Sequence, residues 1–227
     1  MSAVIGEPPG SGLVSNYEPP ALLDQCQLRS SDMTRRRLSP ELRRGELVTT
    51  AAKLFAERAY DDVRMEEVAA AAGVSRALLY RYFPAKNELF LAVYEQAAGD
   101  LLAATEPDPA LSPTEYLLAG LDIHLDYFVA NRNTVLAANR VLARDSRVQA
   151  VITGELGQLR ERLLDRLGLT GDLREQVGGL VDAWLELVRV LCVDWLDRGM
   201  TWPREQVRDA CAGALLGGLQ PLLGDGG

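Results

Sequence analysis

The residues best suited to binding chemistry lie in the segment GVSRALLYRYFPAK, which spans positions 73–86. If residues 76–83 are helical, one face of that helix is both basic and aromatic. Its outward positions are Arg76, Ala77, Leu78, Tyr80 and Arg81. Guanidinium groups bind phosphates and base edges, so this surface indicates a nucleic-acid contact. The alternative is a simple buried helical hairpin, which needs no basic and aromatic outer face.

Two short helices joined by a tight turn are expected to position this surface. Apolar residues from Met65 onward recur at helical spacing, and four alanines at 69–72 allow the next helix to approach closely. Gly73 supplies backbone freedom for the turn, and Ser75 can cap the helix that follows. In a helix-turn-helix the first helix braces the backbone while the second lies in the major groove of DNA. The pattern over residues 64–83 therefore predicts a helix-turn-helix.

The rest of the chain from Ser39 onward also follows helical periodicity, and no segment alternates like a strand. Ser39 and Pro40 suit the first positions of a helix that continues to about residue 59. Further helices are expected over residues 86–104, 113–131, 133–144, 146–167, 172–198 and 203–223. We therefore predict an all-α protein of about nine helices. A three-helix helix-turn-helix domain at 38–85 would join a larger helical domain at 86–227, with residues 86–104 as the connector.

Residues 1–37 are predicted to form a disordered arm that is basic at its end. The first 32 or so residues are rich in Pro, Gly, Ser and Asn, and show no sustained periodicity. A run of arginines follows at positions 35–37. Translation from Met33 is the alternative, and it would leave only a short basic arm.

Charge is distributed unevenly along the chain, whose net charge is −8. Residues 33–95 contain eleven Lys and Arg against nine acids, whereas residues 96–227 contain twelve against nineteen. The only positive stretch therefore coincides with the predicted motif. Positive charge there and negative charge elsewhere is typical of a DNA-binding domain joined to an effector domain.

Other classes of function lack the residues that they need. The chain has one histidine, His124, and three widely spaced cysteines, which fit neither a disulfide framework nor a zinc site. An all-helical enzyme or carrier with an incidental hairpin is the less favoured alternative, and we expect no catalytic residue, cofactor or metal. We also expect no membrane span and no secretory signal, and hence a cytoplasmic protein.

The run from Leu47 to Glu95, and most specifically GVSRALLYRYFPAKNELF within it, resembles the DNA-binding domain of the tetracycline-repressor (TetR) family. The resemblance implies a sequence-specific DNA-binding transcription regulator, most often a repressor that a small-molecule effector releases from a palindromic operator. It also implies a homodimer formed through the last two helices and an effector pocket in the C-terminal domain. A DNA-binding dimer without a ligand is the alternative.

The resemblance also assigns roles to individual residues. Ser75 would cap the second helix of the motif; Arg76, Ala77 and Leu78 would face base edges; Tyr80 would meet a phosphate or a thymine methyl group. Lys86 would bind phosphate at the start of the next helix, where the helix dipole favours an anion. Further phosphate or minor-groove candidates, which could instead be a solvated charge run, are Arg35, Arg36, Arg37, Arg43 and Arg44.

Three positions depart from the family's pattern. Ala59 stands where a glycine usually follows the first helix, so that turn is expected to differ. Arg64 replaces a Thr or Ser cap, and its charge adds it to the candidate DNA contacts. Ala85 likewise replaces a capping serine. The pose of the first helix of the motif is therefore the weakest part of the prediction.

The larger domain offers two further sets of candidates. Polar-tipped or aromatic residues on apolar segments are candidates for a ligand pocket, although each also fits a structural role in the core: His124, Tyr127, Phe128, Asn131, Asn139, Arg140 and Trp184. Apolar and small residues of the last two helices are assigned to the dimer interface, with packing inside one subunit as the alternative: Leu180, Leu187, Leu191, Trp195, Ala210, Ala214, Leu215 and Gly218.

Overall fold

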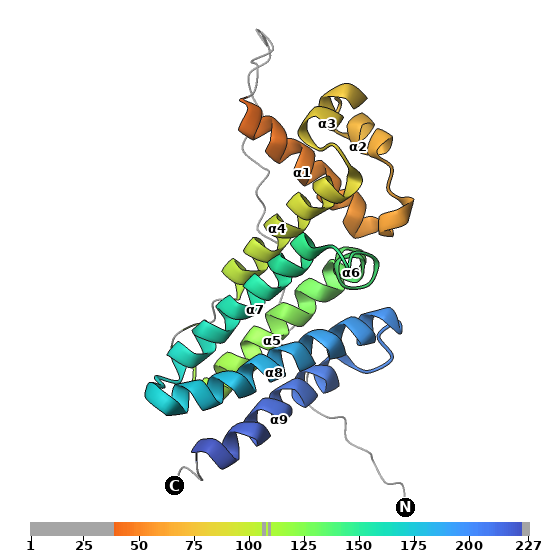
Figure 1. The fold of residues 1–227 in the computed structure, drawn as a ribbon. Coiled ribbons are helices and arrows are strands. Elements are labelled where there is room, and N and C mark those ends of the chain that lie inside the picture. Colours follow the sequence, from red (N-terminus) through yellow and green to blue (C-terminus); the bar gives the residue numbers. More distant parts are fainter. Residues whose placement is uncertain (1–38, 106–107, 109, 224–227) are drawn as a thin grey trace, which may run out of the picture. The chain divides into compact units, whose positions relative to one another are not determined.

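The computed structural model describes residues 39–105, 108 and 110–223, and these contain nine α-helices and no strand. The predicted all-α fold is confirmed (Figure 1). The helices are α1 (Pro40–Glu57), α2 (Met65–Ala71), α3 (Arg76–Tyr82), α4 (Lys86–Ala104), α5 (Pro113–Ala130), α6 (Arg132–Leu136), α7 (Ser146–Arg166), α8 (Gly171–Asp197) and α9 (Arg204–Leu223). No helix in the described ranges is long and apolar enough to cross a membrane. The predicted arm at 1–37 lies outside the described residues.

Local chemistry explains where the helices begin. The Ser39 hydroxyl accepts a hydrogen bond from the Leu42 N–H at 3.3 Å, and Pro40 occupies the first position of α1. At α5 the Ser112 hydroxyl accepts from the Glu115 N–H at 3.3 Å, while the Glu115 carboxylate accepts from the Ser112 N–H at 2.9 Å. Both starts agree with the sequence prediction.

Two segments differ from the expected helices. The helix expected to reach about residue 59 ends at Glu57, and a 3₁₀ turn, η1 (Tyr60–Asp62), follows. Ala59 has φ −58°, so this turn needs no left-handed residue and no glycine. The helix expected over 133–144 is divided into α6 and a π-turn, η2 (Ala137–Val141).

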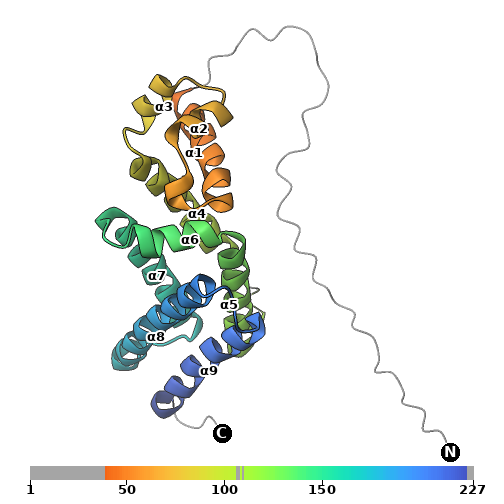
Figure 2. The same ribbon diagram turned by 90° about the vertical axis from the view of Figure 1, so that its right-hand side faces the viewer.

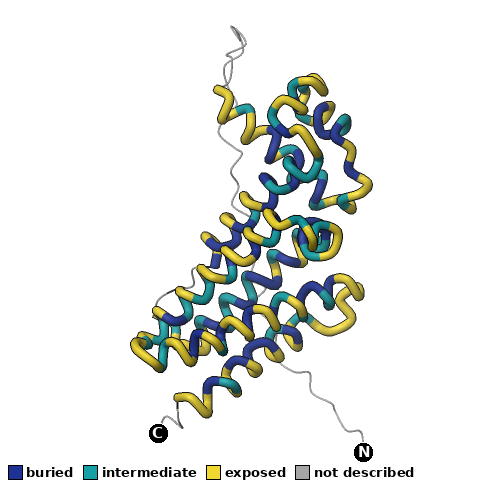
Figure 3. Tube along the Cα trace, viewed as in Figure 1, coloured by how far each residue is buried: buried dark blue, intermediate teal, exposed yellow. Residues whose placement is uncertain are grey.

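The core consists of two clusters of buried side chains. Figure 3 shows where buried residues lie along the chain. One cluster joins α1 to α4 and also includes Ala137, Ala138, Val148 and Ile152 from η2 and α7. The other joins α5, α8 and α9, and it includes Leu101 near the end of α4. Packing is therefore continuous across the predicted border at 85/86, and the described residues form one compact unit.

Polar contacts also join the first four helices to the α6–α7 segment. The Asn133 side chain donates to the Ala56 carbonyl at 2.9 Å, which fastens α6 to the end of α1 (Figure 2). At the start of α4, the Asn87 amide donates to the Asp145 carboxylate at 3.3 Å and Glu88 pairs with Arg147 at 2.6 Å. Asp145 also caps α7.

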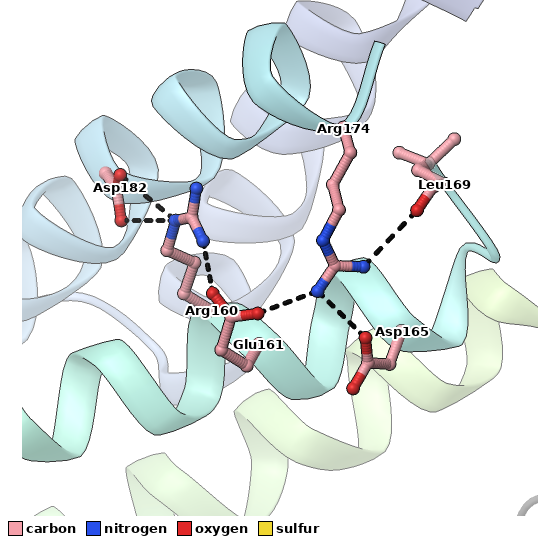
Figure 4. A network of polar contacts seen from close by, with 6 residues as sticks. All are labelled: Arg160, Glu161, Asp165, Leu169, Arg174 and Asp182. Carbon is pink, nitrogen blue, oxygen red and sulfur yellow. Dashed lines mark hydrogen bonds and ion pairs between the residues drawn. The ribbon is translucent and has the colours of Figure 1, made fainter. Parts of the chain in front are cut away.

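An ion-pair network joins α7 to α8 (Figure 4). Arg174 Nη2 lies 2.7 Å from a Glu161 carboxylate oxygen and 2.8 Å from one of Asp165, and its Nη1 donates to the Leu169 carbonyl at 3.3 Å. Arg160 on α7 reaches Asp182 on α8 at 3.1 Å. These contacts join the C-terminal half of α7 to the N-terminal half of α8. Both helices also contribute side chains to the cavity described below.

Candidate nucleic-acid interface and internal cavity

The turn between α2 and α3 has the geometry that a helix-turn-helix needs. Gly73 lies in the left-handed region at φ 65°. The Gly73 N–H donates to the Ala70 carbonyl at 3.1 Å and the Val74 N–H donates to the Ala69 carbonyl at 2.9 Å, which is the Schellman pattern. The Ser75 hydroxyl then accepts from the Leu78 N–H at 3.2 Å and caps α3 as expected. Leu79 is fully buried and anchors α3.

The opposite face of α3 is open to solvent. Arg76, Ala77, Tyr80 and Arg81 are exposed and Leu78 is half-buried, so the structure places all five predicted contact residues of α3 on an accessible surface. Arg81 lies over the Tyr82 ring at 5.7 Å. Phe83 is buried, and Arg44 of α1 lies over its ring at 5.1 Å. Tyr82 is half-buried, in keeping with a packing role for it and for Phe83.

Arg76 is paired in this structure. Its Nη2 lies 2.5 Å from a Glu66 carboxylate oxygen on α2, although 67% of the Arg76 side chain remains exposed. An exposed ion pair of this kind contributes roughly 0–1 kcal/mol, so a base edge or phosphate can compete for the guanidinium. Sequence reasoning missed this pair because Glu66 and Arg76 lie on different helices.

The other predicted arginines have different surroundings. Arg64 is exposed and precedes α2; its side chain cannot accept a hydrogen bond, so only the reciprocal bond is made, from the Arg64 N–H to the Glu67 carboxylate at 3.0 Å. Arg43 is half-buried and pairs with Glu46 at 2.7 Å within α1. Arg36 and Arg37 lie outside the described residues.

Lys86 differs from the expected free cation. Its Nζ donates to the Tyr60 carbonyl at 2.9 Å and the Val63 carbonyl at 3.2 Å, and lies 4.3 Å from the centre of the Tyr60 ring. Lys86 therefore fastens the turn after α1 to the start of α4. These contacts give Lys86 a structural role that the sequence did not predict, and they use two of its three N–H donors. The phosphate contact stays a prediction. Ala85 provides no side-chain cap to α4, as predicted.

Lys86→Met should lower the free energy of unfolding by about 1–3 kcal/mol, because two backbone carbonyls lose their donor. Thermal unfolding measures this loss. Lys53→Met is the matched control, since Lys53 is the only other lysine in the chain and is exposed on α1. Unchanged stability together with weaker binding to every DNA duplex would instead assign Lys86 to a phosphate contact alone.

A cavity of about 70 Å³, measured as the space open to the centre of a water-sized molecule, lies among α4, α5, α7 and α8. Most of its wall is apolar, and part of it comes from Leu117, Leu121, Leu159, Leu163 and Val188. A few polar groups converge on it, which is typical of sites for small molecules. The polar and aromatic lining residues that sequence reasoning missed are Tyr94, Thr105, Tyr116, Glu155, Arg162 and Arg189.

Four of the seven predicted pocket residues line this cavity: His124, Phe128, Asn139 and Trp184. The other three do not. Tyr127 packs against the core, Asn131 donates to the Tyr127 carbonyl at 3.0 Å at the end of α5, and Arg140 pairs with Asp197 at 3.3 Å on the surface of α8. Tyr127 on α5 and Arg140 in η2 lie on other faces of their helical turns than His124 and Asn139, which line the cavity.

Three buried ionisable side chains in the wall have shifted pKa values: His124, Glu155 and Tyr94, whose pKa burial raises. Burial lowers the pKa of His124 to about 4, so its imidazole is neutral near pH 7. The ring contacts that of Phe128, with centres 4.2 Å apart and planes tilted by 37°. Burial raises the pKa of the Glu155 carboxyl to about 7. Glu155 follows Val148 and Ile152 on the buried face of α7. A charged residue within that apolar stripe was the signal in the sequence.

The predicted dimer residues fall into three groups. Leu187, Ala210 and Ala214 are exposed, and so are Val190 and Leu216, which sequence reasoning did not assign. Leu180, Leu191 and Gly218 are half-buried. Trp195 and Leu215 are buried within the chain, where the Trp195 indole donates to the Trp202 carbonyl at 2.9 Å. Packing between α8 and α9 takes up these two, so we correct their assignment to core residues.

Comparison with known proteins places this architecture in a class. Residues 47–93 match the profile of the bacterial regulatory proteins of the tetR family. The chain is similar to the HTH-type transcriptional activator FasR of Mycolicibacterium smegmatis, with 40% identity over 67 residues that cover 30% of this chain and 31% of FasR. It is similar to the HTH-type transcriptional regulator RutR of Escherichia coli K12, with 31% identity over 118 residues that cover 50% and 54% of the two chains.

The similarity extends further among solved structures. A tetR-family transcriptional regulator from Streptomyces coelicolor is 25% identical with a TM-score of 0.72, over 82% of this chain and 83% of that one. FadR from Bacillus subtilis in complex with stearoyl-CoA, at 16% identity and a TM-score of 0.59 over 77% and 98% of the chains, shares the fold. The chain is thus an all-helical protein with an N-terminal helix-turn-helix. The tetR family is the one that its residues 47–93 match.

The matched segments span about a third of FasR and about half of RutR. The family profile covers residues 47–93, which include the helix-turn-helix. It therefore supports the helix-turn-helix more directly than the cavity.

Proposed function

We propose that this protein is a sequence-specific DNA-binding transcription regulator, and most specifically a repressor that a small-molecule effector releases from its operator. The observation that carries the proposal is the exposed basic and aromatic face of α3, held by a capped turn against α2. Such a helix fits the major groove, where base edges are distinguishable. The similarity to FasR and RutR, both named as HTH-type regulators, supports the same role.

The effector site in this proposal is the cavity among α4, α5, α7 and α8. A ligand that favours one arrangement of these helices would shift α4, which continues from the helix-turn-helix into the cavity wall. FadR, complexed with stearoyl-CoA, has the same fold, so the fold can accommodate a bound ligand. The cavity makes a regulator without any ligand the less favoured alternative.

The cavity gives little support to the alternative that this protein is an enzyme. His124 and Glu155 are ionisable, but neither hydrogen-bonds to another side chain in the described part of the molecule. The Thr105 hydroxyl, which lines the same space, donates to the Leu101 carbonyl at 2.6 Å. A nucleophile held by a base is the arrangement that catalysis would need.

A homodimer is part of the proposal. One recognition helix contacts few base pairs, whereas two related by a two-fold axis read both halves of a palindromic operator. The exposed apolar side chains of α8 and α9, chiefly Leu187, Val190 and Leu216, provide a surface for pairing. Small exposed residues on α9, Ala210 and Ala214, allow another helix to approach closely.

The test is competition between the protein's own upstream DNA and a random duplex of equal length at moderate salt. We expect preference for the upstream DNA, and we expect Arg76→Ala to reduce that preference by about 10-fold or more because a base contact contributes about 1–3 kcal/mol. Arg198→Ala is the control, since Arg198 is exposed at the end of α8. Equal competition by random DNA would end the proposal of a site-specific regulator.

A further inference from the structure

Glu155 is the unpaired charge of the cavity. Its residue is 8% exposed, and it lines the cavity from α7. No hydrogen bond or ion pair joins its carboxylate to another described residue. A buried carboxylate without a donor is unfavourable, so proteins rarely keep one unless it has a partner or a ligand. The cavity is the space from which a partner can come.

The two arginines that line the cavity together with Glu155 are already engaged. Arg189 on α8 donates from Nη1 to the Asn139 side chain at 2.9 Å and pairs with Glu186 at 2.6 Å. Arg162 on α7 donates from Nη1 to the carbonyls of Leu102 at 2.5 Å and Thr105 at 3.2 Å. Neither arginine makes an ion pair with Glu155. In this cavity the carboxylate of Glu155 lacks a hydrogen-bond donor, whereas both arginines already have acceptors. The cavity therefore suits a cationic ligand better than an anionic one.

The remaining wall sets the rest of the ligand's chemistry. Leucine and valine side chains surround the space, and the rings of Phe128 and Trp184 close part of it. Trp184 cannot turn its indole N–H toward a ligand, because that group donates to the Cys211 carbonyl at 2.7 Å. A ligand that fits this wall buries an apolar body and can present a donor to Glu155, while Tyr94 and Tyr116 also line the space.

We propose that this cavity binds an organic amine, a positively charged nitrogen on an apolar body, whose ammonium group pairs with the carboxylate of Glu155. The inference rests on the proposed function only in taking this cavity as the effector site. A charge-assisted hydrogen bond would satisfy the buried carboxylate, and the apolar body would bury its surface against the wall.

The protonation states make this binding depend on pH. Burial raises the pKa of Glu155 to about 7, so pairing with an ammonium group ionises a carboxyl that is partly protonated at neutral pH. Among the groups that line the cavity with it, Tyr94 on α4 has a raised pKa and stays neutral, and His124 on α5 is neutral above pH 5. Arg162 on α7 and Arg189 on α8 make the contacts given above. Affinity for an amine should therefore rise from pH 5 to pH 8.

Calorimetry on the full chain without DNA tests the proposal. The probes are 4-phenylbutylamine and n-octylamine, each compared with the alcohol and the carboxylate of the same carbon skeleton. At pH 8 we expect at least one amine to bind at least 10-fold more tightly than its alcohol and its carboxylate. Glu155→Gln should remove that advantage, whereas Glu95→Gln, at an exposed position on α4, should retain it.

Three results would overturn the proposal: no binding of either amine, tighter binding of the carboxylates, or amine binding that Glu155→Gln leaves unchanged. The rise in affinity from pH 5 to pH 8 gives a second readout in the unaltered protein. If an amine binds but does not release operator DNA, the effector role fails while this inference stands. If other compounds release the DNA and the amines do not bind, the proposed function stands while this inference fails.

Discussion

Val190→Arg is expected to make the protein monomeric and to lower its affinity for an operator by at least about 100-fold. Val190 is 50% exposed on α8, one turn from Leu187, which is 44% exposed. Pairing through this face would bury the arginine without a partner, at a cost of several kcal/mol. A monomer reads one half-site and loses the gain from linking two recognition helices.

Light scattering after gel filtration measures the mass, and gel-shift titration measures the affinity. Val141→Arg is the matched control, because Val141 is also 50% exposed but lies in η2, away from α8 and α9 in the sequence. Val141→Arg should remain dimeric and bind normally. A dimer that persists in Val190→Arg would mean that the pairing surface lies elsewhere.

Glu155 and His124 are expected to change the free energy of unfolding in opposite directions between pH 4.5 and 6.5, so that their contributions cancel. The raised pKa of Glu155, about 7, means that the folded state loses stability as pH rises from the ordinary value of 4.5 toward 7. The lowered pKa of His124, about 4, means that stability is lost as pH falls from 6.5 toward 4. Each shift corresponds to about 3 kcal/mol.

Replacing either residue should reveal how the other one makes stability depend on pH. Relative to the unaltered protein, Glu155→Gln should gain up to about 3 kcal/mol of stability as pH rises from 4.5 to 7, and its own stability should fall steeply on acidification below 6.5. His124→Gln should show the reverse slope. Denaturant unfolding at a series of pH values measures both. Parallel pH profiles of Glu155→Gln and the unaltered protein would show that Glu155 titrates normally.

The helices could be predicted from the sequence because their ends are encoded locally. Ser39, Ser75 and Ser112 each accept a hydrogen bond from a backbone N–H within their own first turn, and Gly73 takes the left-handed conformation itself. The outward face of α3 also follows from periodicity within one helix. These features depend on few residues and short separations, so the pattern alone was sufficient.

The partners of charged side chains could not be predicted in the same way. Lys86 meets the carbonyls of Tyr60 and Val63, and Arg76 meets Glu66, only because separate helices bring them together. The cavity is similar, since its wall combines four helices whose relative rotation no local rule gives. Asn139 and Arg140 are neighbours in the chain, yet one lines the cavity and the other pairs with Asp197 outside it.

Side-chain contacts tie Asn133 to α1, and Asp145 and Arg147 to α4; these contacts are called tethers below. They limit which segments of this protein can be exchanged with those of a relative. Chain order suggests that residues up to 85 could be exchanged for those of a relative to give a sensor with a new operator. The shared core and the tethers show that such a graft would also have to carry the matching surfaces of α6, η2 and α7. The transferable module is defined by packing, and it is discontinuous in the sequence.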